Sequence, residues 1–556
     1  MEMTGAQILI ETLIEQGVSD VFGYPGGQVL NIYDELYKNS DRIHHVLSAH
    51  EQGAAHAADG YARTSGKVGV VIATSGPGAT NLVTGIANAQ LDSVPMVAIT
   101  GNVPCDLIGR DSFQEIDITG ITLPITKHNY FINDVTKLAD SIREAFKIAK
   151  SGRPGPVLID IPKDVQTAVC DFTKKDVEPA FKNDIADENS IQKAIELINQ
   201  SKRPYIYVGG GVISSDVCDL VLKLADKTDA VIGCTLMGLS AVPTDNERFL
   251  GMQGMHGQFA SSMAQNNADL IIAVGTRFSD RATGNKQKYA KKSKIIHFDV
   301  DFAEINKNIS VDVGVLGDLK NSLTRTIDGC CEKENPDWHK IIDKLRYKEE
   351  SFYEKTDRFT PKKAIEIINS IVDEDTVIAT DVGQHQMWAA QYCNFKKKRK
   401  FVSSGGLGTM GFGLGAAIGA QKGSNSHVVL ITGDGSFGMN LNEMATAVSY
   451  NIPVTVVIVN NGVLGMVRQW QTLFYEKHYS NTTLNRKTDF VKLAEAFGAE
   501  GVRAQNAEEF KAAFEKAYNT DGPVIIDCVI DKDEFVLPML PPGGSIDDII
   551  VEKEDV

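Results

Sequence analysis

Two oxygen-bearing side chains, Asp434 and Asn461, lie 27 residues apart, and each follows a short β-branched apolar run. Asp434 stands between two glycines, Gly433 and Gly435. Carboxylate and amide oxygens are hard ligands that suit Mg²⁺ or Ca²⁺ better than zinc. Flanking glycines let the backbone approach an anion closely, and the amino end of a helix favours phosphate. The pattern therefore predicts a divalent cation that holds a diphosphate.

The flanking segments must place these two side chains next to each other. Residues 428–432 and 453–459 are apolar runs of the strand type, and 441–448 has the apolar spacing of an amphipathic helix. Strand, helix and strand in this order predict a βαβ crossover with parallel strands. Asp434 and Asn461 would then lie at the carboxyl edge of the sheet, where open α/β folds bind ligands. The alternative is that Asp434 is an ordinary turn residue and Asn461 an ordinary strand-end residue, and that neither binds a ligand. The pairing of the two residues across one βαβ unit argues against this alternative.

The bulk composition narrows the class of protein. A chain of 556 residues is too long for one hydrophobic core and predicts about three or four domains. With 72 acidic and 56 basic residues the net charge is −16, which disfavours nucleic acid and anionic membrane surfaces as partners. The eight cysteines form no CxxC pair, no apolar run approaches the roughly 20 residues of a membrane span, and the first residues lack a basic leader. We therefore expect a reduced, cytoplasmic protein that does not associate with a membrane.

Apolar strands that end in glycine-rich turns, each followed by a helical pattern, recur along most of the chain. This alternation predicts an α/β fold with three doubly wound parallel sheets. A polar stretch at 171–190 and a charged one at 330–359 predict the connections between the sheets. We expect the Pro- and Gly-rich tail to pack loosely or to become ordered only with substrate. The expected domains are 1–170, 190–330 and 360–535, followed by the tail, 536–556.

Glu51 is the candidate for acid–base chemistry. It begins a helical pattern, where a glutamate is usually only a favourable partner of the helix dipole. Its histidine neighbours, His50 and His56, are six residues apart and do not form the HExxH zinc motif. The same expected domain holds the motifs YPGG, TSGPGATN and PKDV at 24–27, 74–81 and 162–165. These neighbouring motifs favour a catalytic carboxylate over a capping one.

Segment 405–420 contains a formal GxGxxG pattern. A Rossmann dinucleotide site is one interpretation, but this fingerprint alone is weak, and the only acidic residue at a suitable distance is Asp434. The other interpretation is a loop in which the Gly408 backbone and the Met410 side chain hold the ring of a cofactor.

Glycine turns follow several strand patterns in the middle of the chain. Each turn alone is routine in an α/β fold, but together they predict a site for an extended nucleotide cofactor. The turns and neighbouring motifs lie at 209–211, 254–257, 275–281, 297–301 and 317–318. Trp470, four residues after Met466 on an expected helix, is either a core aromatic or part of a pocket wall above the cofactor.

These motifs together resemble the catalytic subunits of the acetohydroxyacid (acetolactate) synthase family over essentially the whole chain. GDG followed by NN resembles the thiamine diphosphate (ThDP) signature of the wider superfamily. RPGPVLIDIPKDV, MVRQW and the PPG tail resemble the FAD-containing biosynthetic branch. The other matching strings are YPGG, HEQGAAHAADGYAR, TSGPGATN, SFQE, ITKHN, GMHG, GQHQMWAAQ, SGGLGTMG and LPMLPPG.

The resemblance implies a transferase that decarboxylates pyruvate on ThDP and joins the two-carbon fragment to pyruvate or 2-oxobutyrate. This is the first common step of valine, leucine and isoleucine biosynthesis. Glu51 would bond to the aminopyrimidine of ThDP and so promote removal of the weakly acidic thiazolium proton. Arg281 would hold the carboxylate of the second substrate, and Trp470 would shape the pocket for its alkyl group. The other implied residues of the catalytic site are Gly27, Phe113, Gln114 and Lys163.

The resemblance also implies three cofactors. Asp434, Asn461 and the carbonyl group of Val463 would bind Mg²⁺. ThDP would contact Glu51, Gln384, His385, Gly408, Met410, Gly433, Gly435, Ser436 and Met466, with Met410 supporting a bent conformation. FAD, in a structural rather than a redox role, would lie along Arg153, Gly209, Gly210, Gly211, Thr235, Met255, His256, Gly275, Thr276, Arg277, Asp299 and Asp318.

Partner subunits are implied as well. In this family the activating glutamate reaches ThDP from the neighbouring subunit, so a homodimer is the least active unit and a tetramer is possible. Biosynthetic members usually also bind a small regulatory subunit that transmits branched-chain amino-acid feedback. The chain departs from the common family pattern at four positions, none of which the chemistry requires: Gln28, Ala49, Thr276 and Ser279.

Two other functions compete with this one. The first is another ThDP enzyme that acts on pyruvate, an oxidase or a decarboxylase, and Arg281 together with MVRQW argues against it. The second is an inactive paralogue that binds the cofactors and scaffolds a partner. The presence of Glu51, Asp434 and Asn461 argues against that role.

Overall fold

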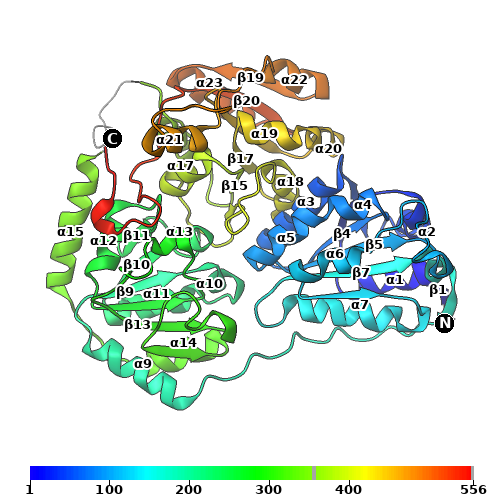
Figure 1. Ribbon diagram of the computed structural model, residues 1–556, viewed down its shortest axis with the longest axis horizontal. Helices are drawn as coiled ribbons and strands as arrows, with labels where there is room; N and C mark the ends of the chain where they lie inside the picture. The colour runs from blue at the N-terminus through cyan, green and yellow to red at the C-terminus, as the bar shows by residue number, and fades with distance from the viewer. Residues whose placement is uncertain (353–357, 553–556) are drawn as a thin grey trace.

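The computed structural model describes residues 1–352 and 358–552, which form three α/β domains (Figure 1). Each domain is built on a parallel sheet of six strands. The predicted α/β fold with three parallel sheets is therefore confirmed. Parts of the predicted connector 330–359 and of the predicted tail 536–556 lie outside the described residues.

The N-terminal sheet has the strand order β3-β2-β4-β5-β7-β6. Successive side chains of a strand point to opposite faces, so both faces need a cover. Val70 and Ile72 of β4 pack with α1 (Gly5–Glu15), α2 (Leu30–Lys38) and α7 (Val135–Lys150), whereas Val71 and Ala73 pack with α3 (Glu51–Ser65) and α5 (Val83–Asp92). The strands are β2 (Asp20–Tyr24), β3 (His44–Leu47), β4 (Gly69–Ala73), β5 (Met96–Asn102), β6 (His128–Phe131) and β7 (Pro156–Pro162). Short elements complete this domain: α4 (Pro77–Asn81), α6 (Ile118–Thr122), α8 (Lys163–Thr167) and the antiparallel pair β1 (Glu2–Thr4) and β8 (Val169–Asp171).

The central sheet has the order β11-β10-β9-β12-β13-β14, so the direction of winding reverses between β9 and β12. This is the strand order of dinucleotide-binding folds, whose ligands bind where the order reverses. The strands are β9 (Pro204–Val208), β10 (Val231–Cys234), β11 (Phe249–Met252), β12 (Leu270–Val274), β13 (Lys294–Asp299) and β14 (Val313–Leu316). The helices are α9 (Glu188–Gln200), α10 (Gly210–Ser214), α11 (Cys218–Thr228), α12 (Phe259–Asn267), α13 (Asp280–Thr283), α14 (Leu319–Gly329) and α15 (Pro336–Ser351).

The C-terminal sheet, β16-β15-β17-β18-β20-β19, repeats the winding of the N-terminal one. β17 and β18 are parallel neighbours with Gly433 opposite Val459, as the βαβ prediction requires. The strands are β15 (Val377–Thr380), β16 (Phe401–Val402), β17 (Val428–Gly433), β18 (Val454–Asn460), β19 (Glu500–Ala504) and β20 (Val524–Val529). The helices are α16 (Pro361–Ile371), α17 (Gln384–Tyr392), α18 (Gly413–Ser424), α19 (Asp434–Asn440), α20 (Met444–Ser449), α21 (Gly465–Phe474), α22 (Phe490–Phe497) and α23 (Ala507–Tyr518).

The N- and C-terminal domains pack through α3 and α18, whose backbones touch at glycines. A side chain at Gly419 would meet the carbonyl oxygen of Ala57 at 1.7 Å, and one at Gly60 would meet that of Ala416 at 2.0 Å. Such contacts leave no room for any residue larger than glycine. The interface therefore fixes α3, and with it Glu51, relative to the C-terminal domain.

The tail is packed rather than loose, so that expectation was wrong for residues 536–552. Val536 and Met539 have no exposed surface, and Met539 forms an antiparallel bridge with Ile550. The N–H of Leu540 donates to the carbonyl oxygen of Met255 at 2.7 Å. The tail thus returns to the central domain, where Figure 1 draws it in red. Within the described residues no helix is both long enough and apolar enough to cross a membrane.

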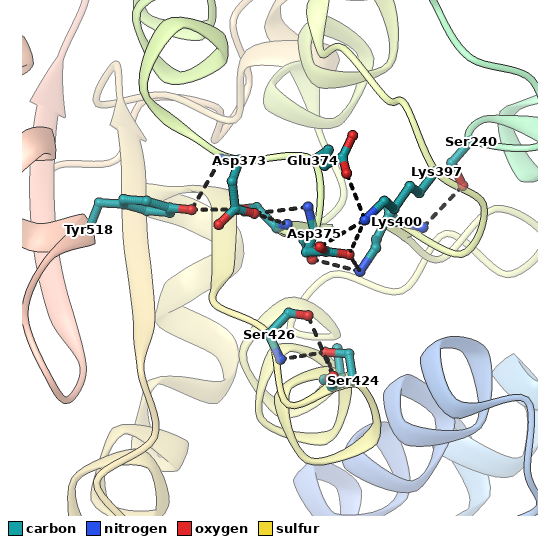
Figure 2. Close-up of polar contacts among 11 residues, drawn as sticks. Ser240, Asp373, Glu374, Asp375, Lys397, Lys400, Ser424, Ser426 and Tyr518 are labelled. Atoms are coloured by element: carbon teal, nitrogen blue, oxygen red, sulfur yellow. Dashed lines mark hydrogen bonds and ion pairs between the residues drawn. The ribbon is translucent and has the colours of Figure 1, made fainter.

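Charged residues gather at the amino ends of β15 and β16, and two serines, Ser424 and Ser426, precede β17 at the same edge (Figure 2). The Nζ atom of Lys397 lies 2.8 Å from Asp375 Oδ2, and Lys400 donates to the Asp375 carbonyl oxygen at 2.6 Å. The N–H of Asp373 donates to the Tyr518 hydroxyl at 3.2 Å. The Lys397 and Asp375 side chains are 42% and 57% exposed, so water screens their ion pair and it adds little to stability. This edge is opposite the one that carries Asp434.

Asp160, in β7, provides a test of stability against pH. It accepts hydrogen bonds from the Thr100 hydroxyl at 2.7 Å and from the Asn102 amide at 2.6 Å, and burial raises its pKa from 3.8 to about 7. Between these values the folded protein keeps a proton that the unfolded chain has released, so stability falls as pH rises. Asp160→Asn cannot titrate, so the unfolding free energy of the variant relative to wild type should rise by about 2 kcal/mol from about pH 5 to about pH 8. Urea unfolding at both pH values measures the change, and parallel profiles would contradict it.

Candidate active site

A cleft with a volume of about 1330 Å³ lies where the three domains meet. All the residues implied for FAD line it: Arg153, Gly209, Gly210, Gly211, Thr235, Met255, His256, Gly275, Thr276, Arg277, Asp299 and Asp318. So do five residues implied for ThDP or the second substrate: Arg281, Gly408, Met410, Met466 and Trp470. The structure therefore gathers two groups of predicted residues, distant in sequence, around one space.

The central-domain wall of this cleft fits an extended nucleotide. The turn after β9, Gly209–Gly211, touches the turn after β12, because a side chain at Gly209 would meet the Gly275 carbonyl oxygen at 2.0 Å. Among the described residues, the Nε2 atom of His256 and the hydroxyl of Thr276 are buried without a hydrogen-bond partner. Burial lowers the pKa of His256 to about 4, which keeps the ring neutral. Tight glycine turns and free polar atoms at the reversal of strand order are what a nucleotide cofactor needs.

The predicted metal ligands meet at the carboxyl edge of the C-terminal sheet. Asp434 is the first residue of α19, and Asn461 directly follows β18. The Asn461 side chain accepts a hydrogen bond from the N–H of Val463 at 3.2 Å and donates to Gln384 Oε1 at 3.3 Å. Asp434 is 8% exposed, and burial raises its pKa to about 6. A cation beside this carboxylate would offset the cost of burying its charge.

The chemistry of this donor set favours Mg²⁺ held together with a diphosphate. In the described part of the chain no group of three or more His, Cys, Asp or Glu residues is arranged to hold a metal ion. Only Asp434 among the three predicted ligands brings a carboxylate. Mg²⁺ commonly takes one or two carboxylates and completes its shell with phosphate oxygens and water. The residues present fit such a shared site and do not fit a metal held by protein alone.

His385 lies beside the same glycine turn. It is buried, its Nε2 atom has no hydrogen-bond partner in the part of the chain that the structure describes, and burial lowers its pKa to about 3. A side chain at Gly433 would meet the imidazole Nδ1 at 2.8 Å. Ser436 donates to the carbonyl oxygen of Val382 at 2.7 Å. A neutral imidazole with one free nitrogen next to a helix start can hydrogen-bond a phosphate oxygen.

The catalytic residues predicted in the N-terminal domain form a separate group at the carboxyl edge of their own sheet. Glu51 begins α3 half-buried, and Asn81 donates to its carboxylate at 3.0 Å. Lys163 Nζ donates to the carbonyl oxygen of Gly27 at 3.1 Å. Phe113 is 84% exposed.

Two glycines at the start of α4 contact members of this group. A side chain added at Gly78 would meet Glu51 Oε1 at 3.3 Å, and one at Gly76 would meet Gln114 Cβ at 2.8 Å. Neither Glu51 nor Gln114 lines the cleft of this chain. Asp434 and Asn461 do not line it either, but a side chain at Gly435 would meet the Met410 Cε atom at 3.9 Å, so the diphosphate ligands adjoin the cleft. One chain therefore carries two part-sites, one with the predicted acid and one with the cleft wall and the predicted diphosphate ligands.

Trp470 is a wall residue rather than a core aromatic. It lies on α21, is half-buried and lines the cleft. The Arg281 guanidinium, from α13 of the central domain, lies 5.6 Å from the Trp470 ring. A cation and an aromatic side chain at one rim can hold a carboxylate and an alkyl group of the same small molecule.

Two positioning residues were missed from the sequence. Asp381 directly follows β15 and accepts a hydrogen bond from the N–H of Gly411 at 2.8 Å. A polar residue just after an apolar run at a sheet edge is a signal that could have identified it. Asp92, at the end of α5, holds the loop before Gly411 and has no motif around it.

The Rossmann interpretation of the GxGxxG pattern gains no support from the fold. The pattern follows β16, a two-residue strand at the edge of its sheet. Dinucleotide fingerprints follow a strand at the reversal of strand order, and β16 is not there.

Family models match all three domains. The chain matches the thiamine pyrophosphate enzyme N-terminal TPP binding domain over 3–121, the central domain over 191–326 and the C-terminal TPP binding domain over 381–528. Together with two part-sites on similarly wound sheets and a central sheet with the strand order of dinucleotide-binding folds, these matches define a thiamine diphosphate-dependent enzyme.

Similar proteins from a bacterium, an archaeon and a plant identify the family within this class of enzymes. The acetolactate synthase large subunit of Corynebacterium glutamicum is 46% identical over 98% of this chain and 90% of its own length. The probable acetolactate synthase large subunit of Methanocaldococcus jannaschii is also 46% identical, over 99% and 95%. Acetolactate synthase 2 of Nicotiana tabacum is 43% identical over 99% and 85%. The chain belongs to the acetolactate synthase large-subunit family.

Proposed function

We propose that this protein is an acetolactate synthase. It decarboxylates pyruvate on ThDP and ligates the two-carbon fragment to pyruvate or 2-oxobutyrate, the first common step of branched-chain amino-acid biosynthesis. Besides family membership, the observation that supports this most is Arg281 beside Trp470 at the rim of the cleft. An oxidase or a decarboxylase has no second 2-oxoacid to bind and therefore no need of this pair.

The chain's own groups have distinct tasks in this reaction. When bound, ThDP would supply a weakly acidic thiazolium C–H whose deprotonated carbon can add to the substrate ketone. Glu51, oriented by Asn81, would exchange a proton with the aminopyrimidine ring. Asp434, Asn461 and the Val463 carbonyl would hold Mg²⁺ against the diphosphate.

The binding residues complete the site. Arg281 would fix the carboxylate of the second substrate, and Lys163 would present a cation from the wall that the N-terminal part-site of a second chain supplies. Gly27, Phe113 and Gln114 belong to that wall. His385 and Ser436 would border the diphosphate, and Met410 would support the pyrimidine.

We include FAD as a structural cofactor in the central-domain part of the cleft. The unpartnered atoms of His256 and Thr276 and the contact between the Gly209 and Gly275 turns support this assignment. Thr276 and Ser279, which depart from the common family pattern, both line the cleft. The net reaction transfers no electrons between its substrates and products, so the flavin has no redox task in it.

A homodimer would complete the active site. Glu51 and Asp434 belong to different part-sites of one chain, and a second copy can bring the N-terminal group to the diphosphate site. Large apolar side chains lie exposed near both part-sites, as an interface between copies requires. Examples are Leu30, Leu47, Phe113, Leu123 and Met439.

The proposal also includes a regulatory partner, a cellular location and the domain boundaries. Relatives named as large subunits support a small regulatory partner. The reduced cysteines support a cytoplasmic location. We retain the domain boundaries 1–170, 190–330 and 360–535, with the tail at 536–556.

The direct test is the product formed from pyruvate by purified protein with ThDP and Mg²⁺. We expect acetolactate, and a yellow protein whose visible spectrum is that of bound flavin. Acetaldehyde or acetate in place of acetolactate would overturn the proposal in favour of a decarboxylase or an oxidase.

Trp470→Leu should change which second substrate is used. The indole ring borders the space beside Arg281, so its loss removes contact with the extra methyl group of 2-oxobutyrate. We expect the preference for 2-oxobutyrate over pyruvate to fall about tenfold, the scale of one methylene in an apolar pocket. Competition between the two acids measures the ratio. Phe474→Leu, which removes only the ring packed against Trp470, is the matched control, and an unchanged ratio in Trp470→Leu would refute the assignment.

A further inference from the structure

A buried aspartate, Asp92, joins two domains at the wall of the cleft. It is the last residue of α5 in the N-terminal domain, and its side chain has no exposed surface. Oδ1 accepts a hydrogen bond from the N–H of Gly406 at 2.7 Å, and Oδ2 accepts one from the N–H of Gly405 at 3.0 Å. Both glycines belong to residues 404–411 of the C-terminal domain, which we call the glycine loop. One carboxylate thus anchors this loop to another domain.

The Asp92 carboxylate is itself held in place by other buried side chains of the N-terminal domain. The Arg63 guanidinium lies 2.9 Å from its Oδ2 and also pairs with Asp59, and the Arg63 side chain is only 9% exposed. Asp59 in turn accepts a hydrogen bond from the Asn88 amide at 3.0 Å. Because every charge in this buried group has partners, its geometry is fixed, and loss of one partner carries a large penalty.

The glycine loop depends on these anchors for its position. Asn88 Oδ1 accepts hydrogen bonds from the hydroxyls of Ser404 and Thr409, so the loop is held at both ends. Between them the chain reads Gly-Gly-Leu-Gly, and Gly408 has a φ of +70°. Glycine-rich backbone has many accessible conformations, so the hydrogen bonds to Asp92 select one of them.

The same peptides also face the central domain. A side chain at Gly406 would meet the Arg277 guanidinium at 3.0 Å, and one at Gly405 would meet the Met237 sulfur at 2.4 Å. Asp92, Arg277 and both glycines line the part of the cleft proposed for FAD.

Further along the same loop are the two residues proposed for ThDP. Gly408 and Met410 follow Gly406 by two and four residues and line the same cleft. One short segment therefore borders both proposed cofactors, with Asp92 at its flavin end.

We propose that Asp92 is a positioning residue through which FAD and ThDP support each other's binding. A flavin against Arg277 favours the loop conformation in which Asp92 holds Gly405 and Gly406, and this conformation places Gly408 and Met410 for the pyrimidine. Binding linkage is reciprocal, so ThDP tightens FAD by the same factor. The inference rests on the proposed function, which assigns both cofactors, and it gives the flavin a task in a reaction without net redox change.

Flavin fluorescence tests this coupling without any activity assay. Cofactor-free protein is titrated with FAD in Mg²⁺ buffer, with and without saturating ThDP. In wild type we expect ThDP to lower the FAD dissociation constant about tenfold, within the range common for coupled sites. In Asp92→Asn, which presents an amide donor to a backbone N–H, the factor should fall below about twofold.

Two more variants separate positioning from general loss of stability. Gly406→Ala inserts a methyl group 2.9 Å from Asp92 Oδ1 and leaves the Arg63 ion pairs intact, so it should also weaken the coupling. Asp160→Asn makes the same chemical change at a buried carboxyl of the same domain that does not line the cleft, and it should keep the wild-type factor.

The outcomes are distinct. The inference would be overturned if both Asp92→Asn and Gly406→Ala kept the wild-type coupling factor, or if Asp160→Asn lost as much of it as they do. It would also be overturned if the FAD affinity of the wild-type protein were the same with and without ThDP. Failure of wild type to bind FAD would overturn both the inference and the flavin assignment. Acetolactate formation, assayed in parallel, reports separately on the proposed reaction.

Discussion

Glu51→Gln should abolish acetolactate formation while leaving ThDP binding near that of wild type. The amide can still accept the hydrogen bond from Asn81, but it cannot exchange a proton with the aminopyrimidine ring. General acid–base groups of this kind contribute about 10²- to 10⁴-fold to the rate, so we expect turnover of at most about 1% of wild type. Steady-state assay gives the rate, and calorimetric titration with ThDP gives the affinity.

The matched control for this substitution is Glu11→Gln in the same domain. Glu11 makes its ion pair with Arg42, away from both part-sites, so its loss should leave turnover unchanged. Near-normal turnover in Glu51→Gln would remove the carboxylate from the proposed mechanism. A large loss of ThDP affinity would instead mean that Glu51 mainly binds the cofactor.

Asp434→Ala should prevent productive cofactor binding. It removes the only carboxylate among the proposed metal ligands, so Mg²⁺ loses its one anionic ligand from the protein and is held only by neutral oxygens and the diphosphate. Loss of an outer-shell partner already costs about 10- to 100-fold in metal affinity, so we expect more than about 100-fold for this ligand. Titration of ThDP at fixed Mg²⁺, followed by calorimetry, measures the effect.

Asp375→Ala is the control on the opposite edge of the same sheet (Figure 2). It removes an exposed ion pair and should change neither affinity nor turnover. Retention of Mg²⁺-dependent ThDP binding by Asp434→Ala would contradict the metal assignment.

The two inactive variants should restore each other when mixed. If Glu51 of one chain serves the cofactor held by Asp434 of its partner, a mixed dimer contains one fully intact site. Random reassociation of equal amounts should then recover about a quarter of wild-type activity. No recovery after demonstrated subunit exchange would mean that both groups act within one chain.

Local patterns predicted much of the site because the chemistry lies at strand ends. Asp434 and Asn461 needed only one βαβ unit to be brought together, and β17 and β18 supply it. Helix α20 (Met444–Ser449) covers most of segment 441–448, whose apolar spacing indicated a helix, but the structure adds a second short helix, α19, that begins at Asp434 itself. Glycines at 435 and 438 weaken helix propensity, but the buried side chain of Phe437 shows that tertiary packing outweighs it.

Contacts between domains could not be predicted in the same way. Asp92 lies more than 300 residues before the loop that it holds, and nothing in its immediate sequence marks it. The tail was expected to be loose from its composition, yet backbone hydrogen bonds such as that of Leu540 to Met255 dock it on the central domain. The composition of a segment indicates how much apolar surface that segment can bury by itself. It does not indicate which contacts another domain makes with it.

The most direct measurement follows ¹³C-labelled pyruvate by NMR during turnover by the purified protein with ThDP, Mg²⁺ and FAD. We predict resonances of 2-acetolactate and, when 2-oxobutyrate is added, of 2-aceto-2-hydroxybutyrate as well. Pyruvate consumption that yields only acetaldehyde or acetate, or no consumption by protein loaded with all three cofactors, would contradict the proposed function.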